Sequence, residues 1–255
     1  MIQTRCTVTD CHSVNANIYV LSFRSAEIAS LVLPGQFVNI KVNELHQPLL
    51  RRPFSVYRTQ GDCVDIIFNV VGTGTSVLSM RRPGDTIDII GPLGTSYRVD
   101  DRYETALLVA GGLGLAPLPL LTQWLQSTRK PVETFLGART KDLLVTEYLQ
   151  GVNVATDDGS AGFHGTVVDL LYRELNAKRY SSAKIFACGP NVMLKSLSRL
   201  ALQFNIPCEV SLESAMACGM GICQGCPVER VGGEKKYALI CTDGTVFDTR
   251  TIRMP

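Results

Sequence analysis

The stretch TALLVAGGLGLAPLPLLTQWLQS, residues 105–127, marks a change in the pattern of the chain. It opens with a continuous apolar run, passes through three glycines, and continues with apolar residues at helical spacing. A short apolar run without alternation is typical of a strand that is covered on both faces, as strands of parallel sheets are. The stretch therefore predicts a buried strand, a tight glycine turn and a helix, which together form the repeating unit of an α/β domain.

Strand and helix patterns continue to alternate as far as about residue 210. Three further apolar runs are each followed by a segment with helical spacing: VETFLGA (132–138) by KDLLVTEYLQ (141–150), VNVATDD (152–158) by GTVVDLLYREL (165–175), and SAKIFACG (182–189) by NVMLKSLSRLALQF (191–204). Strands separated by helices of this length are typical of a parallel sheet. Residues 101–210 are therefore expected to form one α/β domain.

The first hundred residues show a different pattern. Short runs rich in Val, Ile, Phe and Tyr are separated by Gly, Pro, Asn and Asp: RCTVTDCHSV (5–14), ANIYVLSF (16–23), GQFVNIKV (35–42), FSVYR (54–58) and CVDIIFNVV (63–71). This pattern favours a small antiparallel β-barrel over residues 1–100. One break, GTGTSVLSMRRPGD (72–85), predicts a short helix that ends before Pro83.

Four of the nine cysteines gather near the end of the chain, in a third region at 211–255. Cys218, Cys223 and Cys226 have the spacing C-x4-C-x2-C, and Cys241 follows. This is the plant-type spacing for a [2Fe–2S] cluster. A structural zinc site is the alternative, but such sites usually carry two close C-x2-C pairs. The tail also contains two strand candidates, KYALI (236–240) and TVFD (245–248).

Two weaker signals lie in the expected barrel. In LLRRPFSVYR (49–58), Arg52 offers a guanidinium to a phosphate and Ser55 a hydroxyl to a ring nitrogen. The alternative is a solvated arginine at a barrel edge. The second signal, GTGTSVL from Gly72, places glycines and hydroxyls before the short helix, where backbone N–H groups favour an anion. A plain surface turn is the alternative there.

The α/β region carries two candidate nucleotide-facing turns. Gly111, Gly112 and Gly114 follow the first buried strand and would let phosphates approach the backbone. The motif is not G-x-G-x-x-G, because Pro117 stands at the place of its third glycine, so a tight turn without a ligand is the alternative. The sequence CGP at 188–190 ends another strand, where α/β sheets bind ligands; a plain turn is the alternative there.

The order of these motifs resembles the ferredoxin–NADP reductase superfamily over residues 1–210. With the cysteine tail, the whole chain resembles the electron-transfer subunits of the B-type, NAD-linked dihydroorotate dehydrogenases of pyrimidine biosynthesis. SLESAMACGMGICQGC (211–226) is the stretch most specific to that family. The resemblance implies an FAD-binding barrel, an NAD-binding α/β domain and a [2Fe–2S] domain.

The resemblance also implies roles for individual residues. The FAD motif corresponds to Arg52, Pro53, Phe54 and Ser55, the next flavin segment to Ile67, Phe68 and Asn69, and the phosphate turn to Gly74 and Thr75. The nucleotide turns correspond to Gly111, Gly112, Gly114, Pro117, Cys188, Gly189 and Pro190, and the cluster ligands to Cys218, Cys223, Cys226 and Cys241. No residue is assigned to catalysis with certainty; Cys188 is a candidate for a place beside the nicotinamide, or else simply packs.

Flavin exchanges electrons with nicotinamide in pairs and with an iron–sulfur cluster singly, so FAD between them would convert one into the other. Since the chain shows no second substrate pocket, the resemblance implies a partner. This would be an FMN-containing catalytic subunit in a heterotetramer of two of each, passing electrons from dihydroorotate to NAD+. Three alternatives remain: a subunit of an NADP-linked transhydrogenase, a subunit of a sulfide dehydrogenase, or a zinc-stapled or redox-sensing scaffold that is not an enzyme.

Charge and composition exclude other classes. The 25 basic and 23 acidic residues leave a net charge of +2 without long runs of one sign, which argues against nucleic-acid binding and against a membrane anchor. No apolar stretch is long enough to span a membrane, and MIQTRCTVTDCHSV lacks the core of a secretion signal, so a cytoplasmic protein is expected. His12, His46 and His164 are isolated, and Glu213 and Asp243 are interpreted as solvated loop charges or partner contacts.

Overall fold

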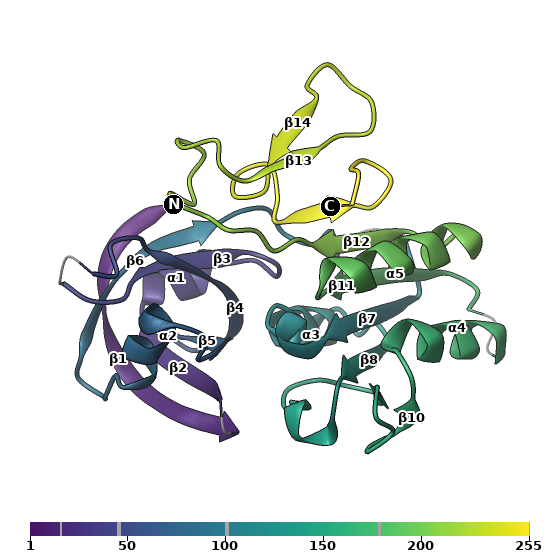
Figure 1. The fold of residues 1–255 in the computed structure, drawn as a ribbon, viewed down its shortest axis with the longest axis horizontal. Helices are drawn as coiled ribbons and strands as arrows, with labels where there is room; N and C mark the ends of the chain where they lie inside the picture. Colours follow the sequence, from purple (N-terminus) through teal and green to yellow (C-terminus); the bar gives the residue numbers. More distant parts are fainter. Residues whose placement is uncertain (16, 45–46, 100–101, 178–179, 255) are drawn as a thin grey trace.

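The computed structural model describes residues 1–15, 17–44, 47–99, 102–177 and 180–254. It contains a closed barrel, a seven-stranded sheet flanked by helices, and a tail above both (Figure 1). None of the helices in the described part of the chain is long and apolar enough to cross a membrane.

The barrel confirms the antiparallel architecture expected for the first hundred residues. Its strands follow the order β1-β2-β5-β4-β3-β6, and neighbouring strands are antiparallel. The strands are β1 (Ile2–Asn15), β2 (Ile18–Arg24), β3 (Phe37–Lys41), β4 (Arg52–Gln60), β5 (Cys63–Asn69) and β6 (Thr86–Leu93), with helices α1 (Ala26–Leu31) and α2 (Thr73–Ser79) between them. Strand β6 was not among the predicted strands. Among the described strands of this half, closure of the barrel leaves no free sheet edge.

The second sheet confirms the parallel α/β architecture. Its order is β10-β9-β8-β7-β11-β12-β15, and only β15 is antiparallel to its neighbour. The strands are β7 (Thr105–Gly111), β8 (Val132–Ala138), β9 (Val152–Thr156), β10 (Phe163–His164), β11 (Ala183–Cys188), β12 (Cys208–Ser211) and β15 (Val246–Asp248). The short strands β10 and β12 were not predicted.

Helices cover both faces of this sheet. Apolar side chains of α4 (Val167–Ala177) and α5 (Asn191–Gln203) share one core with Leu107 and Ile185. Side chains of α3 (Leu118–Ser127) share another with Leu108 and Phe186, and this second core also takes in barrel residues. Helix α3 therefore lies between the sheet and the barrel (Figure 1), and it holds the two halves in contact.

The prediction of a helix at 141–150 is wrong. Only a single 3-10 turn, η2 (Lys141–Leu143), forms there, and the chain then continues without regular structure to β9. Tyr148 takes a left-handed backbone angle (φ 61°), packs edge-on against Tyr57, and lies under the Arg58 guanidinium. These contacts with the barrel outweigh the local helical preference, which is weak in so short a segment.

The tail returns to the α/β sheet. After β12 it forms the short hairpin β13 (Pro227–Glu229) and β14 (Tyr237–Leu239), and β15 then pairs with β12. The two strands predicted in the tail are thus confirmed as β14 and β15, while β13 was not predicted. The division into three domains stays a prediction, because β15 belongs to the tail in sequence and to the α/β sheet in space.

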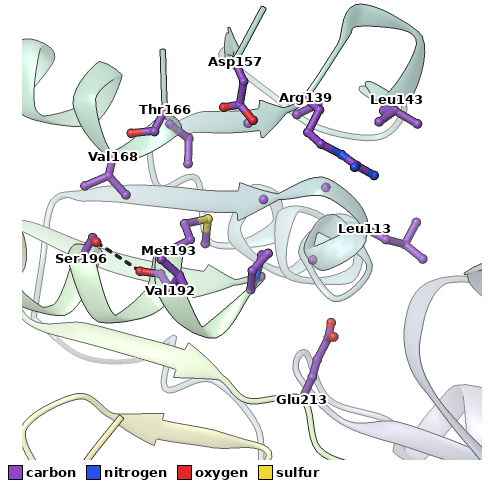
Figure 2. A pocket seen from close by; sticks show the side chains of 18 of the residues that line it. Leu113, Arg139, Leu143, Asp157, Thr166, Val168, Val192, Met193, Ser196 and Glu213 are labelled. Atoms are coloured by element: carbon purple, nitrogen blue, oxygen red, sulfur yellow. Dashed lines mark hydrogen bonds between the residues drawn. The ribbon is translucent and has the colours of Figure 1, made fainter. Parts of the chain in front are cut away.

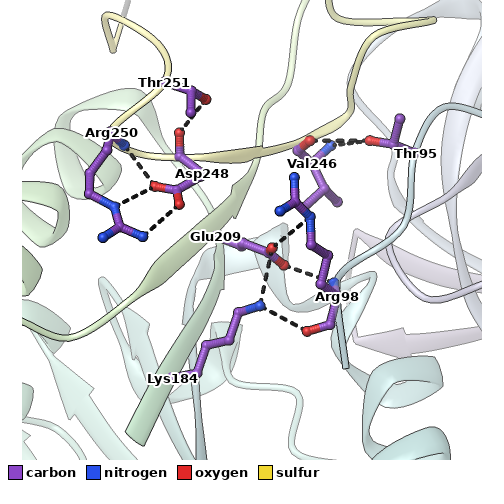
Figure 3. Close-up of polar contacts among 8 residues, drawn as sticks. All are labelled: Thr95, Arg98, Lys184, Glu209, Val246, Asp248, Arg250 and Thr251. Carbon is purple, nitrogen blue, oxygen red and sulfur yellow. Dashed lines mark hydrogen bonds and ion pairs between the residues drawn. The ribbon is translucent and has the colours of Figure 1, made fainter. Parts of the chain in front are cut away.

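A buried ion pair holds the link between the two halves in place (Figure 3). Lys184 Nζ lies 3.1 Å from Glu209 Oε1 and donates a hydrogen bond to the Arg98 carbonyl. The Arg98 N–H in turn donates to Glu209 Oε2 at 2.9 Å. Nearby, the Thr95 hydroxyl donates to the Val246 carbonyl at 3.1 Å. The connection from β6 to β7 is therefore bonded to β11, β12 and β15 at once.

Candidate functional site

A cavity of about 320 Å³ lies where the barrel faces the α/β sheet. Most of the residues predicted to contact a flavin line it: Pro53, Phe54, Ser55, Ile67, Phe68, Asn69 and Thr75. Strand β4 lies between β3 and β5, which places the two flavin segments side by side. The opposite wall comes from the α/β half and the tail, through Leu113, Ala116, Ser211, Leu212 and Glu213.

An aromatic pair supports the barrel side of the flavin cavity. The ring centroids of Phe54 and Phe68 lie 5.6 Å apart with their planes tilted by 57°. Phe54 therefore packs against Phe68 where both side chains line the cavity. A planar ligand bound here would contact rings that are already held by neighbours, which reduces the entropy lost on binding.

Arg52 and Gly74 meet beside this cavity. A Cβ on Gly74 would lie 3.2 Å from Arg52 Nε, so the absence of a side chain lets the guanidinium approach the first turn of α2. Arg52 Nη1 donates to the Leu50 carbonyl at 2.7 Å. The Thr75 hydroxyl oxygen accepts from the N–H groups of Val71 and Gly72. The predicted phosphate-binding residues are thus brought together, with one fixed cation among them.

A larger cavity of about 950 Å³ lies at the carboxyl edge of the parallel sheet. Its floor is made by turns that follow β7, β8 and β11, where open α/β sheets bind ligands. Figure 2 shows Arg139 and Asp157 at one end of this cavity and Glu213 at the other. The predicted residues that line it are Gly111, Gly112, Gly114, Gly189 and Pro190.

Pro117 and Cys188 lie behind this surface. Pro117 is the buried N-cap residue of α3, and Cys188 is buried at the end of β11. A Cβ on Gly114 would clash with the Cys188 carbonyl oxygen and would lie 2.5 Å from Gly189 Cα. Gly114 is therefore required by the packing of two turns against each other, in addition to any approach by a ligand.

Glu213 is the functional candidate that sequence reasoning missed. It lines both cavities, and its Oε1 accepts from the Cys188 thiol at 3.9 Å. Glu213 is exposed at the mouth of the two cavities, but the protein around its carboxyl partly desolvates it and raises its pKa. Burial, and then the nearby Glu213 carboxylate, raises the pKa of the Cys188 thiol well above its ordinary value. Sequence analysis interpreted Glu213 as a loop charge because it lies close to the cysteines. Its position just after β12, at the edge of the sheet where ligands bind, was the feature that could have identified it.

Replacing Glu213 by glutamine is expected to stabilise the fold at about pH 8 by no more than about 1 °C in melting temperature, because the residue is exposed and solvent screens its charge. Because the native state raises the Glu213 pKa, it binds the proton more tightly than the unfolded chain does, so the carboxylate lowers stability at pH values above its raised pKa. The gain should vanish as the pH falls below the ordinary carboxyl pKa. Melting curves over this pH range, with Glu234→Gln as a control, check it; a gain that is independent of pH would contradict it.

The cysteine loop holds its sulfurs as two pairs. Cys218 Sγ lies 3.3 Å from Cys223 Sγ, and the backbone N–H groups of Met220 and Cys223 point at Cys218 Sγ from 3.5 and 3.4 Å. Those N–H groups lower the pKa of the Cys218 thiol to about 6. Gly219 and Gly221 take left-handed angles that allow the loop to wrap around this sulfur.

The second pair is buried. Cys226 and Cys241 are both in the core, and burial together with the neighbouring Cys226 thiol raises the pKa of Cys241 to about 11. In the described part of the chain, no three Cys, His, Asp or Glu side chains are close enough to hold one metal ion. Two pairs of thiols fit a two-iron cluster, which needs two thiolates for each iron, better than they fit one tetrahedral zinc ion.

Comparison with known proteins was consistent with this geometry. Residues 5–97 match the model of an oxidoreductase FAD-binding domain, and residues 213–253 match the iron-sulfur cluster binding domain of dihydroorotate dehydrogenase B. The electron transfer subunit of dihydroorotate dehydrogenase B (NAD(+)) from Desulforamulus reducens is 38% identical, with 92% of each chain covered. The subunit of the same name from Geobacillus thermodenitrificans is also 38% identical, with 95% of each chain covered.

One solved structure resembles the whole chain. It comes from work on flavin-based electron bifurcation by the NADH-dependent reduced ferredoxin-NADP oxidoreductase. The TM-score is 0.86 and the identity 31%, and the match covers 98% of this chain and 90% of that one.

Proposed function

Since this chain belongs to the family of dihydroorotate dehydrogenase B (NAD(+)) electron transfer subunits, we propose that it carries electrons from a catalytic partner subunit to NAD+ in pyrimidine biosynthesis. The electrons would pass through a [2Fe–2S] cluster and FAD. One observation carries the proposal: the flavin cavity shares Asn69, Leu113 and Glu213 with the nucleotide cavity, and Phe37 in its wall faces Gly219 of the cysteine loop. FAD bound in the flavin cavity would therefore lie next to both NAD and the [2Fe–2S] cluster.

In this proposal the barrel holds FAD. Pro53, Phe54, Ser55 and the segment from Ile67 to Asn69 would surround the flavin ring, while Arg52, Gly74 and Thr75 would bind the pyrophosphate. The Arg52 charge and the apolar walls of the cavity support these roles. When bound, FAD supplies the exchange between two-electron and one-electron chemistry; the protein residues orient it and exclude water.

NAD would lie in the larger cavity. Its phosphates and nicotinamide would approach the backbone at Gly111, Gly112, Gly114, Gly189 and Pro190. The position of this cavity at the carboxyl ends of β7, β8 and β11 supports these roles. Pro117 would start α3 behind the turn. Cys188, with Glu213 at 3.9 Å, would lie next to the nicotinamide end of the cavity. Cys218, Cys223, Cys226 and Cys241 would hold the cluster.

We further propose that the catalytic partner contains FMN, docks over the cysteine loop and assembles with this chain as two copies of each. Cys223 is exposed, and the Ile222 side chain beside it is 77% exposed, so an apolar contact stands next to the predicted cluster. Partner binding would cover both. The cytoplasmic location expected from the sequence belongs to this proposal, because the cluster thiols need a reducing compartment.

A second candidate function rests on the solved structure of the NADH-dependent reduced ferredoxin-NADP oxidoreductase. The similarity of that structure to nearly the whole of this chain supports, as the alternative, a subunit of an NADP-linked transhydrogenase. The two functions differ in the partner, so the partner decides between them.

The test begins with protein purified without oxygen, in which iron and flavin are counted for each chain. We expect one FAD and two irons, and bleaching of the visible spectrum by NADH. Addition of an FMN-containing dihydroorotate dehydrogenase subunit should then allow dihydroorotate to reduce NAD+. Zinc without flavin, or no coupling to that subunit, would contradict the proposal.

The docking surface yields a separate prediction. Ile222→Asp is expected to weaken binding of the catalytic partner at least about tenfold, because it places a charge in an apolar contact. Oxidation of NADH by an artificial acceptor should be unchanged, since that reaction needs no partner. Titration of the partner by calorimetry measures the change. Leu202→Asp, at an exposed apolar residue on α5, is the control; equal effects of the two changes would contradict the docking site.

A further inference from the structure

Asn39 joins the barrel to the cysteine loop. It lies on β3, its side chain is 1% exposed, and its Nδ2 donates to the Cys218 carbonyl at 3.0 Å. The two residues are 179 positions apart in the chain. Through this hydrogen bond, a side chain of the barrel directly holds the backbone of a predicted cluster ligand.

The loop is shaped to receive this side chain. A Cβ on Gly219 would lie 2.6 Å from Asn39 Nδ2 and 3.7 Å from the ring of Phe37. Phe37 and Asn39 are two positions apart on one strand, so both side chains emerge on the same face. The glycine after Cys218 therefore packs directly on both.

The amide is held in an orientation that costs stability. A carbonyl oxygen only accepts hydrogen bonds, so the Asn39 group that faces Cys218 must be the NH₂. Within the described chain, the buried Asn39 Oδ1 has no hydrogen-bond partner. An unpaired buried acceptor is unfavourable, and an apolar residue of the same shape would avoid it. A role beyond stability explains why an amide stands here.

The flavin cavity borders the same face of β3, since directly paired residues of neighbouring strands point to one side of a sheet. In the register of β3 and β4, Phe37 pairs with Ser55 and Asn39 pairs with Pro53, which are both residues of the flavin motif. Phe37 itself lines the cavity. The Phe37 side chain thus lies between the expected flavin site and the loop of Cys218.

A second bond attaches the segment after the fourth cysteine to the same part of the barrel. The buried Thr245 hydroxyl donates to the Gly35 carbonyl at 2.6 Å, two residues before β3 begins. Both the Cys218 loop and the segment that follows Cys241 are therefore fixed to β3 and its entry turn.

We propose that Asn39 is a positioning residue for electron transfer between flavin and cluster: its amide fixes the Cys218 peptide against Phe37 and so sets the gap that electrons cross. The proposal rests on the proposed function. In the direction from NADH, a hydride passes to the flavin. Two one-electron transfers past β3 would follow, each reducing one ferric iron of the cluster to ferrous. The cluster would pass the first electron to the FMN of the catalytic partner before it takes the second, and the reduced flavin would release one proton to the solvent. Such transfers slow steeply as the gap widens, so a small shift of the loop has a large effect.

The test compares Asn39→Leu, which keeps the volume but loses the donor, with Asn39→Ser, which keeps a shorter donor. Rapid mixing with NADH resolves flavin bleaching from cluster reduction. We expect Asn39→Leu to bleach flavin at the wild-type rate and to reduce the cluster at least about tenfold more slowly, because a small misplacement is enough for such a loss. Asn39→Ser should be intermediate. Electron paramagnetic resonance of the dithionite-reduced cluster should show altered line positions in Asn39→Leu.

The control is Asn153→Leu, which removes a side-chain donor on β9 far from the cysteines. Wild-type cluster reduction and resonance lines in Asn39→Leu would overturn the proposal. It would also be overturned if Asn39→Leu failed to fold while Asn39→Ser matched the wild type in both rate and spectrum, since Asn39 would then serve packing alone. Failure of NADH to reduce a cluster in the wild-type protein would refute the proposed function itself, before any variant is compared.

Discussion

Cys226→Ala is expected to abolish electron transfer to the catalytic partner while NADH still bleaches the flavin. Cys226 pairs with Cys241 in the buried half of the cysteine site. A cluster that loses one of its four thiolates is not retained. Loss of a residue that merely supports a metal ligand lowers metal affinity or activity about 10–100-fold, so loss of a ligand itself should lower the rate of electron transfer at least about 100-fold. Iron content and the rate of NAD+ reduction by the complex measure the effect.

Cys208→Ala is the matched control for this change. Cys208 and Cys226 are 2% and 3% exposed and belong to the same apolar core, so both changes remove a buried thiol of equal size. Cys208 lies on β12 and is not a predicted ligand. Loss of stability from a small cavity should therefore appear in both variants, whereas loss of iron should appear only in Cys226→Ala. Iron retained in Cys226→Ala would remove this residue from the ligand set.

Gly114→Val is expected to lower the rate of flavin reduction by NADH at least about 100-fold, because displacements of the order of 1 Å have effects of that size. The added side chain would clash with the Cys188 carbonyl and with Gly189, which are backbone atoms of the facing turn. The turns after β7 and β11 would have to separate, and both line the nucleotide cavity. Overpacking of this kind also costs about 1–3 kcal/mol of stability.

Flavin content, melting temperature and single-turnover reduction by NADH check this result. Gly61→Ala serves as the control, because Gly61 lies in the turn between β4 and β5 with open space around it. Its left-handed angle of φ 59° should cost about 1 kcal/mol when a Cβ is added. NADH should still reduce the flavin of that variant normally. Normal reduction by Gly114→Val would mean that the contact between the turns does not shape the nucleotide cavity.

Local patterns predicted most elements of the fold. Apolar runs identified β7, β8, β9 and β11, and alternation with turn residues identified five of the six barrel strands. The strands that sequence reasoning missed are β6, β10, β12 and β13, and the last three contain two, four and three residues. Elements this short carry too few positions for a period to be recognised. They form because a neighbouring strand supplies their hydrogen bonds.

The candidate sites divide in the same way. The flavin and nucleotide motifs were recognisable because glycines, a cation and hydroxyls occur at short spacing in loops next to strand ends. Arg139, Asp157 and Glu213, which line the nucleotide cavity, show no such motif. Their positions follow from the sheet order, in which strands distant in sequence bring their carboxyl ends to one edge.

By itself the sequence determined the chemistry that is carried within short stretches: the four-cysteine spacing, the RPFS segment, the glycine turns and the alternation of strands and helices. Only the tertiary structure decided which distant residues meet. It brought Asn39 to Cys218, set Glu213 between two cavities, added β15 to the parallel sheet and kept 141–150 from forming a helix. The physical reason is that local spacing governs backbone angles and ligand geometry, whereas contacts between remote segments arise from burial and packing that involve the whole chain.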